Sequence, residues 1–263
     1  MTATVHAPAV HEPGTVAVST RAASAEWLRL RTVRSTWWCL LAAAVAVIGI
    51  GVATAVDEAE MADASGSTAS ATLAGQYGVM IGQFALLVLV LLAVTQEYAS
   101  GAIGPTLQWT PRRGVLLAAR VAVPVVCAAV VGVVLAVAAD VTAALMAPSL
   151  TFSTGDLLDS AGGIAAVLLA GGALAVGLGL FLRSTAGALA VVFLLQLVLP
   201  AMLPAFGVQW MADLGELLPG SAAIWTLLGE PEMSAGQAAT LLVGWSGAAL
   251  AVGGWSLLRR DAG

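Results

Sequence analysis

Six apolar stretches, each close to the length of a membrane-crossing helix and almost free of charge, constrain this chain more than any other feature. A helix needs about 20 mostly apolar residues to cross the hydrocarbon core of a bilayer. The stretches are continuous rather than alternating, which favours helices over membrane-spanning strands. The sequence therefore predicts an all-α integral membrane protein with six transmembrane helices, approximately at residues 37–56, 76–95, 117–139, 162–182, 186–206 and 238–258.

The composition of the 263-residue chain supports the same class of protein. Hydrophobic residues make up 60% of the sequence and charged residues only 10%, whereas soluble domains average about 25% charged residues. The mean hydropathy is +0.97. So few charged side chains cannot cover the surface of a water-soluble fold of this size. We expect the lipid bilayer, and not nucleic acid, to be a main partner of this surface.

The distribution of charge predicts how the chain is oriented. All ten basic residues are arginines, and they lie before the first stretch, around the link between the second and third, between the fourth and fifth, and after the sixth. Most of the fifteen acidic residues fall in the opposite connections. Basic residues are enriched in cytoplasmic connections of membrane proteins. The prediction is a multi-pass protein with both its N- and C-termini in the cytoplasm.

Several classes of catalytic site are disfavoured by the residues that the chain lacks. Without lysine it has no Walker loop, in which a lysine contacts the nucleotide phosphates. The two histidines, His6 and His11, precede the first stretch, and no HExxH pattern occurs. Cys39 and Cys127 lie within apolar stretches, which favours packing over a disulfide or a metal site. We expect no enzyme active site, no metal site and no directly bound cofactor.

The N-terminal region divides into a polar leader and an amphipathic segment. Residues 1–23 are predicted to be a disordered cytoplasmic tail, and residues 24–263 a single transmembrane domain. Residues 24–34 have the pattern of a helix lying on the inner leaflet, with Ser24 as its N-cap. The alternative is a charge cluster that only sets topology. The residues expected to contact lipid are Trp27, Arg29, Arg31 and Arg34.

The connection between the second and third stretches, residues 96–114, combines helix breakers with residues suited to recognition. It reads QEYASGAIGPTLQWTPRRG, so its glycines and prolines limit any helix to a short one. Trp109 and the pair Arg112 and Arg113 would face the aqueous side. A short helix carrying such side chains can dock into a cleft of a partner protein. An ordinary loop whose arginines fix topology is the alternative.

Two segments resemble the permease subunits of bacterial type-2 ABC exporters. The segment EWLRLRTVRSTWWCLL, residues 26–41, is similar to the family's entry into its first span. Residues 97–120 resemble the family's cytoplasmic link, with Glu-Tyr, then Gly, then Leu, then Pro-Arg-Arg and a basic residue at the start of the third span. The residues at the family's positions are Glu97, Tyr98, Gly101, Leu107, Pro111, Arg112, Arg113 and Arg120.

The resemblance implies a function that depends on other chains. The link would be a coupling helix that touches a separate cytoplasmic ABC ATPase, with ATP bound in that partner, and Trp109 would join its contact surface. A second permease chain, either a homodimer partner or a paired permease, is also implied, in the bacterial plasma membrane. The expected function is export of a hydrophobic or amphipathic molecule by means of ATP hydrolysed in the ATPase subunit.

Two other functions remain open from the sequence. An ion-coupled secondary transporter usually needs ionisable groups near the bilayer midplane. Asp140 is the candidate, although its place near the end of the third stretch favours a water-exposed helix cap. A non-transporting sensor or immunity protein with the same architecture is the second alternative. Gln83 and Gln196 are expected to be hydrogen-bond partners between helices.

Three further expectations concern packing and connections. Residues 57–72 are predicted to be a solvated loop, because they are rich in small polar and acidic residues. Residues 207–237 are predicted to form short helices that dip into the outer leaflet. Small residues on one face of the fourth stretch permit close helix contact. These residues are Gly163, Gly171, Gly172, Gly177 and Gly179.

Overall fold

The computed structural model describes residues 14–100, 113–229 and 233–260, and most of them are helical. Within this part, six helical segments are long and apolar enough to cross a membrane, and each overlaps one of the predicted stretches. The prediction of an all-α, multi-pass membrane protein is thereby confirmed. The six are α2 (Arg34–Ser65), α3 (Leu73–Ser100), α5 (Arg113–Met146), α6 (Thr154–Leu182), the run formed by α7 (Thr185–Phe193), η1 (Leu194–Val198) and α8 (Leu199–Ala205), and α11 (Ala235–Arg260).

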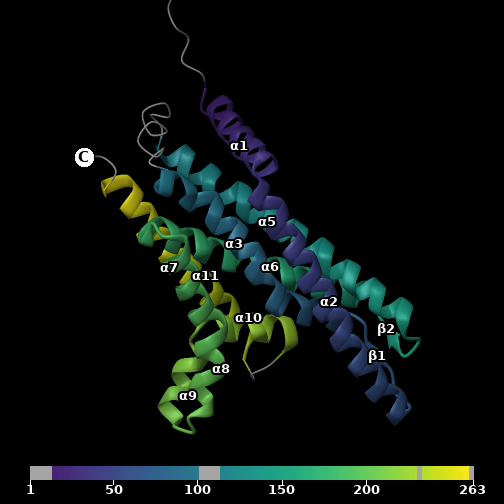
Figure 1. The fold of residues 1–263 in the computed structure, drawn as a ribbon. Helices are drawn as coiled ribbons and strands as arrows, with labels where there is room; N and C mark the ends of the chain where they lie inside the picture. The colour runs from purple at the N-terminus through teal and green to yellow at the C-terminus, as the bar shows by residue number, and fades with distance from the viewer. Residues whose placement is uncertain (1–13, 101–112, 230–232, 261–263) are drawn as a thin grey trace, which may run out of the picture.

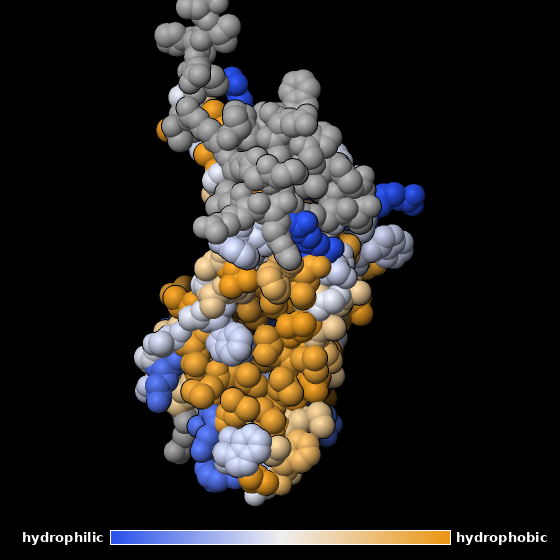
Figure 2. Space-filling view, turned by 90° about the vertical axis from the view of Figure 1, so that its left-hand side faces the viewer, coloured by the Kyte–Doolittle hydropathy of each residue, from blue (hydrophilic) through white to orange (hydrophobic). Residues whose placement is uncertain are grey.

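The helices form an elongated bundle with two distinct ends (Figure 1). The helix α1 (Thr15–Thr32) and the C-terminal end of α11 lie at the same end, as an even number of crossings requires. We call this end, which also carries the last turn of α3 and the first turn of α5, the arginine end, and the opposite end the far end. The middle of the face drawn in Figure 2 is predominantly apolar, as expected of a surface that meets hydrocarbon.

The two longest helices extend well beyond the hydrocarbon core of a bilayer. The 32 residues of α2 and the 34 of α5 span roughly 50 Å at about 1.5 Å per residue, against a hydrocarbon core of about 30 Å. The prediction of a loop over residues 57–72 is wrong for residues 57–65, which continue α2. This segment is rich in alanine and glutamate, which favour helix, and Ala59 packs into a small apolar cluster with α5. The helix ends at Ser65, and Gly66 caps it with a φ of 67°, a conformation that suits glycine.

A two-residue parallel bridge ties two connections together at the far end. The strands β1 (Ala69–Ser70) and β2 (Leu150–Thr151) pair with Ala69 opposite Leu150. The backbone N–H of Ala69 donates to the carbonyl of Ser149 at 3.1 Å, and that of Ala71 to Thr151 at 3.0 Å. The connection from α2 to α3 is therefore held against the connection from α5 to α6.

Glycines bring the long helices into backbone contact. A Cβ atom on Gly78 of α3 would lie 2.2 Å from the carbonyl oxygen of Val47 in α2. A Cβ atom on Gly177 of α6 would lie 2.3 Å from the carbonyl carbon of Ala249 in α11. The expectation that the glycine face of the fourth stretch permits close contact is confirmed, and its partners are helices of the same chain, among them α11.

The fifth span is interrupted by a π-helical turn, η1, between α7 and α8. Pro200 follows this turn and has no N–H to donate to the carbonyl of Gln196, four residues earlier. Gly220, at the start of α10 (Pro219–Leu228), packs so closely on this carbonyl that a Cβ atom would lie 2.2 Å from the oxygen. The π-helical turn thus lies where Pro200 cannot donate a helical hydrogen bond and where Gly220 packs against the Gln196 carbonyl.

Short helices occupy the segment before the sixth span, as predicted for residues 207–237. They are α9 (Gln209–Glu216) and α10. Most of the first half of α10 is buried, and the indole Nε1 of Trp245 in α11 donates to the carbonyl of Leu217 at 2.9 Å. These contacts fasten the connection between α9 and α10 to the sixth span.

The N-terminal helix is longer than the sequence predicts. Residues 1–13 of the expected tail lie outside the described residues, but residues 15–23 form the first part of α1, so this portion of the disorder prediction is wrong. The segment contains alanine and arginine, which favour helix, and no glycine or proline between Thr15 and Thr32. The helix α1 packs along α5, and in the view of Figure 1 it continues roughly along the direction of α2.

Candidate functional site: the arginine end of the bundle

The predicted coupling residues lie at and between the ends of α3 and α5. Glu97 and Tyr98 fall in the last turns of α3, and Arg113 is the first residue of α5. The other predicted residues lie outside the described part of the chain, so their contacts stay a prediction: Gly101, Leu107, Trp109, Pro111 and Arg112. The structure describes how both ends of the link are anchored.

Hydrogen bonds fasten the end of α3 to two other helices just before the link begins. Thr95, only 2% exposed, donates its hydroxyl to the carbonyl of Leu91 at 2.8 Å. Its hydroxyl also forms a short hydrogen bond with that of Thr185, the first residue of α7. The amide Nε2 of Gln96 donates to the hydroxyl of Ser35, at the start of α2, over 3.4 Å. A shift of this helix end would therefore act on α2 and α7 together.

The start of α7 is shaped by a tight turn. Arg183 caps the end of α6 in the left-handed conformation, with φ of 52°. The Ser184 hydroxyl accepts a hydrogen bond from the backbone N–H of Gly187 at 3.3 Å and so caps α7. This turn between α6 and α7 places Thr185 against Thr95.

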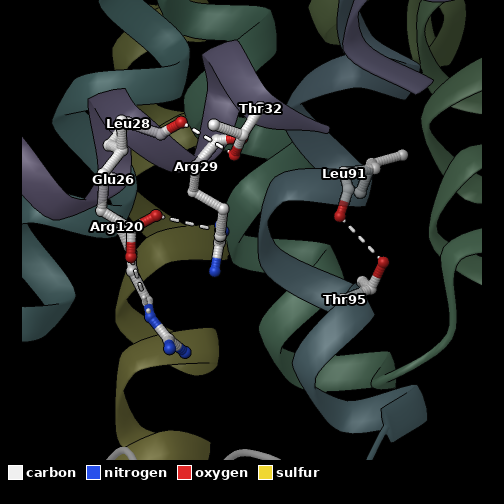
Figure 3. A network of polar contacts seen from close by, with 7 residues as sticks. All are labelled: Glu26, Leu28, Arg29, Thr32, Leu91, Thr95 and Arg120. Atoms are coloured by element: carbon white, nitrogen blue, oxygen red, sulfur yellow. Dashed lines mark hydrogen bonds and ion pairs between the residues drawn. The ribbon is translucent and has the colours of Figure 1, made fainter. Parts of the chain in front are cut away.

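An ion-pair cluster links α1 to α5 at the other end of the link. Arg120 is 1% exposed, and its Nε lies 3.5 Å from Oε1 of Glu26, which is itself 7% exposed. The other carboxylate oxygen of Glu26 lies 3.0 Å from Arg29 of the same helix. Figure 3 shows the carboxylate of Glu26 reaching both arginines. The family resemblance points to Arg120, whereas no motif points to Glu26. The signal for such a partner is that an arginine inside an apolar stretch requires a counter-charge.

The four residues predicted to contact lipid differ in exposure, in their contacts and in the helix that carries them. Trp27 is 49% exposed, and the guanidinium of Arg31 lies 5.9 Å from the centre of its ring. Arg29 instead faces Glu26. Arg34 was assigned to the interfacial helix, but it is the first residue of α2, because the extended backbone of Val33 ends α1.

The polar residues expected within the spans take structural positions. Asp140 was expected to be a water-exposed cap, but it is 1% exposed. It does cap a helix, since its Oδ1 accepts a hydrogen bond of 2.6 Å from the backbone N–H of Gly75 in the first turn of α3. Gln83 donates to the carbonyl of Met80 within α3, so this hydrogen bond lies within one helix and not between helices as predicted. Gln196 is 5% exposed and packs against Gly171 of α6.

Comparison with known proteins leaves the family open. No protein-family model matches the chain, and no curated protein matches it.

Proposed function

We propose that this chain is the membrane-spanning permease subunit of an ABC exporter, driven by a separate cytoplasmic ATPase that docks at the link between α3 and α5. The observation that carries the proposal is the anchoring of this link. At one side Thr95 and Gln96 connect the end of α3 to α7 and α2. At the other side Arg120 connects the start of α5 to Glu26 of α1.

This anchoring suits a segment that receives a mechanical input. A partner that displaces the link would move the ends of α3 and α5, which are bonded to three further helices. Packed helices respond to such displacements by rigid-body or shear movements rather than by gradual deformation. In the proposed mechanism, ATP binding in the partner shifts the link, and these contacts pass the shift on to α2 and α7.

The composition of the spans favours a hydrophobic or amphipathic substrate. Asp140 caps α3, and Gln83 bonds within its own helix. Transport of small hydrophilic ions usually requires ionisable groups or broken helices that coordinate them near the midplane. A hydrophobic or amphipathic substrate, moving along the surface of the bundle or between two permease chains, needs no such groups.

Co-purification tests the proposal. The wild-type chain and a Glu97→Ala, Trp109→Ala, Arg112→Ala variant would be purified from native membranes after mild cross-linking, with Arg21→Ala, exposed on α1, as a control that removes charge away from the link. The proposal predicts an ABC ATPase with the wild type and the control but not with the triple variant. A well-folded wild-type protein that brings no ATPase, or a triple variant that retains it fully, would contradict the proposal.

The burial of Asp140 supports one second candidate, an ion-coupled carrier. An intramembrane carboxylate is costly and often functional, although its bond to Gly75 already explains its presence here. Substitution Asp140→Asn keeps an acceptor oxygen and removes the charge. Transport that loses its dependence on an ion gradient in this variant would favour the carrier, and unchanged ATP-dependent transport would favour the exporter.

A further inference from the structure

An apolar groove of about 280 Å³ opens between α1, α2, α3 and α5 at the arginine end. Four helices contribute to it, so its shape depends on the packing of α1 against the bundle. Its walls include Trp27 and Arg31 of α1, Trp37 and Leu40 of α2, Leu89 of α3 and Val131 of α5. A second depression of about 470 Å³ lies against Trp27 and reaches Val126 of α5, so the indole of Trp27 borders both.

Among the described residues that line the groove, Arg31 is the one charged residue. Arg31 is exposed, and its guanidinium lies 5.9 Å from the centre of the Trp27 ring. The indole Nε1 of Trp37 donates to the carbonyl of Arg31 at 3.2 Å, which fixes the ring beside the arginine. The acid closest in sequence, Glu26, is paired with Arg29 and Arg120. A cationic group thus stands at an otherwise apolar groove.

The level of the groove along the bundle matches that of lipid headgroups. The apolar segments that could cross a membrane begin at Arg34 in α2 and Ala118 in α5, and Trp37 and Trp38 are 60% and 67% exposed. Tryptophan and arginine are typical of the interface between water and hydrocarbon. Leu40 and Val131 lie one turn further along their helices than Trp37 and Cys127, which places the apolar interior within hydrocarbon.

We propose that this groove binds one anionic phospholipid, with its phosphate at Arg31 and an acyl chain against Leu40, Leu89 and Val131. The guanidinium forms charge-assisted, bidentate hydrogen bonds with phosphate oxygens, and the apolar walls exclude water from the chain. This lipid is a resident of the protein surface. Its binding needs neither the ATPase nor transport, so it is tested separately from the proposed function.

Native mass spectrometry of the full-length protein tests the site. Protein stripped of lipid would be titrated with phosphatidylglycerol or phosphatidylcholine. Arg31→Gln should weaken the first bound phosphatidylglycerol about tenfold and phosphatidylcholine less, because the choline group of that lipid offsets the charge of the phosphate that Arg31 contacts. Arg21→Gln removes the same charge from the same helix and should change neither. Equal effects of the two substitutions, or no effect of either, would overturn the proposal.

Two further experiments distinguish a phospholipid in the groove from other occupants. Leu40→Trp fills the groove and should abolish tight binding of both lipids, while inorganic phosphate at the same concentration should not displace the bound phospholipid. In a Cys39→Ser background, bound phosphatidylglycerol should slow alkylation of Cys127, which also lines the groove, and this arm does not depend on how the Trp variant folds. Lack of protection, or a dimer of the chain that Leu40→Trp dissociates, would contradict the lipid site.

Discussion

Glu26 shows at the scale of single residues how strongly a charge inside an apolar bundle constrains its surroundings. Its carboxylate lies between Arg29 and the almost fully buried Arg120, and it joins α1 to α5. Removing one partner of a buried ion pair is costly because the other charge stays in a medium of low dielectric constant. The position of α1 should therefore depend on this carboxylate.

We predict that Glu26→Gln lowers the free energy of unfolding by about 3 kcal/mol. The measurement is unfolding of the detergent-solubilised protein, followed by circular dichroism. A second substitution, Arg120→Gln, made in the same chain should recover part of the loss, because it removes the charge that lost its carboxylate.

Glu60→Gln is the matched control for this prediction. Glu60 is exposed near the end of α2, and surface substitutions of this kind usually change stability by less than about 0.5 kcal/mol. Glu26→Gln that behaves like Glu60→Gln would mean that the ion pair contributes little to the packing of α1.

Close contacts between helices set the arrangement at the scale of elements. We predict that Gly177→Val displaces α11 from α6, since a Cβ atom there would lie 2.3 Å from the Ala249 backbone. Overpacking of this kind typically costs about 1–3 kcal/mol, and the measurement is the thermal unfolding midpoint in detergent together with the monodispersity of the sample.

Gly162→Val provides a control in the same helix. A Cβ atom on Gly162 would meet nothing within 4 Å. Both substitutions therefore carry the intrinsic cost of valine in a helix, but only Gly177→Val adds a clash with α11. Equal losses at the two positions would show that helix propensity, and not the contact with α11, accounts for the effect.

Some elements could be predicted from sequence and others could not, for physical reasons. The six spans follow from local runs of apolar residues, which need no knowledge of their partners. Beside the local residues that favour them, the extension of α2 to Ser65 involves the packing of Ala59 near α5, and the π turn involves the close approach of Gly220 to Gln196. Such contacts join distant parts of the chain and leave no local pattern.

The candidate site was predictable to a similar degree. The link between α3 and α5 could be located from its helix breakers, its tryptophan and its arginine pair. Its anchoring through Thr95 and Thr185, and through Glu26 and Arg120, joins residues far apart in the chain. A single sequence carries no signal for such pairs beyond the need of a buried charge for a counter-charge.

At the scale of the whole molecule, the distribution of arginines and the arrangement of the helices distinguish the same two ends of the bundle. The helix α1, the ends of the link and the C-terminal end of α11 lie at one end of the bundle, and the β1 and β2 pair lies at the other (Figure 1). The proposed ATPase contact requires the arginine end to face the cytoplasm, whereas a phospholipid can enter the groove from the leaflet at either side of the membrane. The orientation of the chain in the membrane therefore underlies the proposed function.

Cysteine accessibility in intact cells tests this orientation most directly. In a Cys39→Ser, Cys127→Ser background, single cysteines would replace Ala25 on α1, Trp109 in the link and Thr68 at the far end, of which Ala25 and Thr68 are exposed in the structure. A membrane-impermeant maleimide should label only Thr68→Cys before permeabilisation and all three variants afterwards. Labelling of Trp109→Cys in intact cells, or of Thr68→Cys only after permeabilisation, would contradict a cytoplasmic link and with it the proposed coupling to an ATPase.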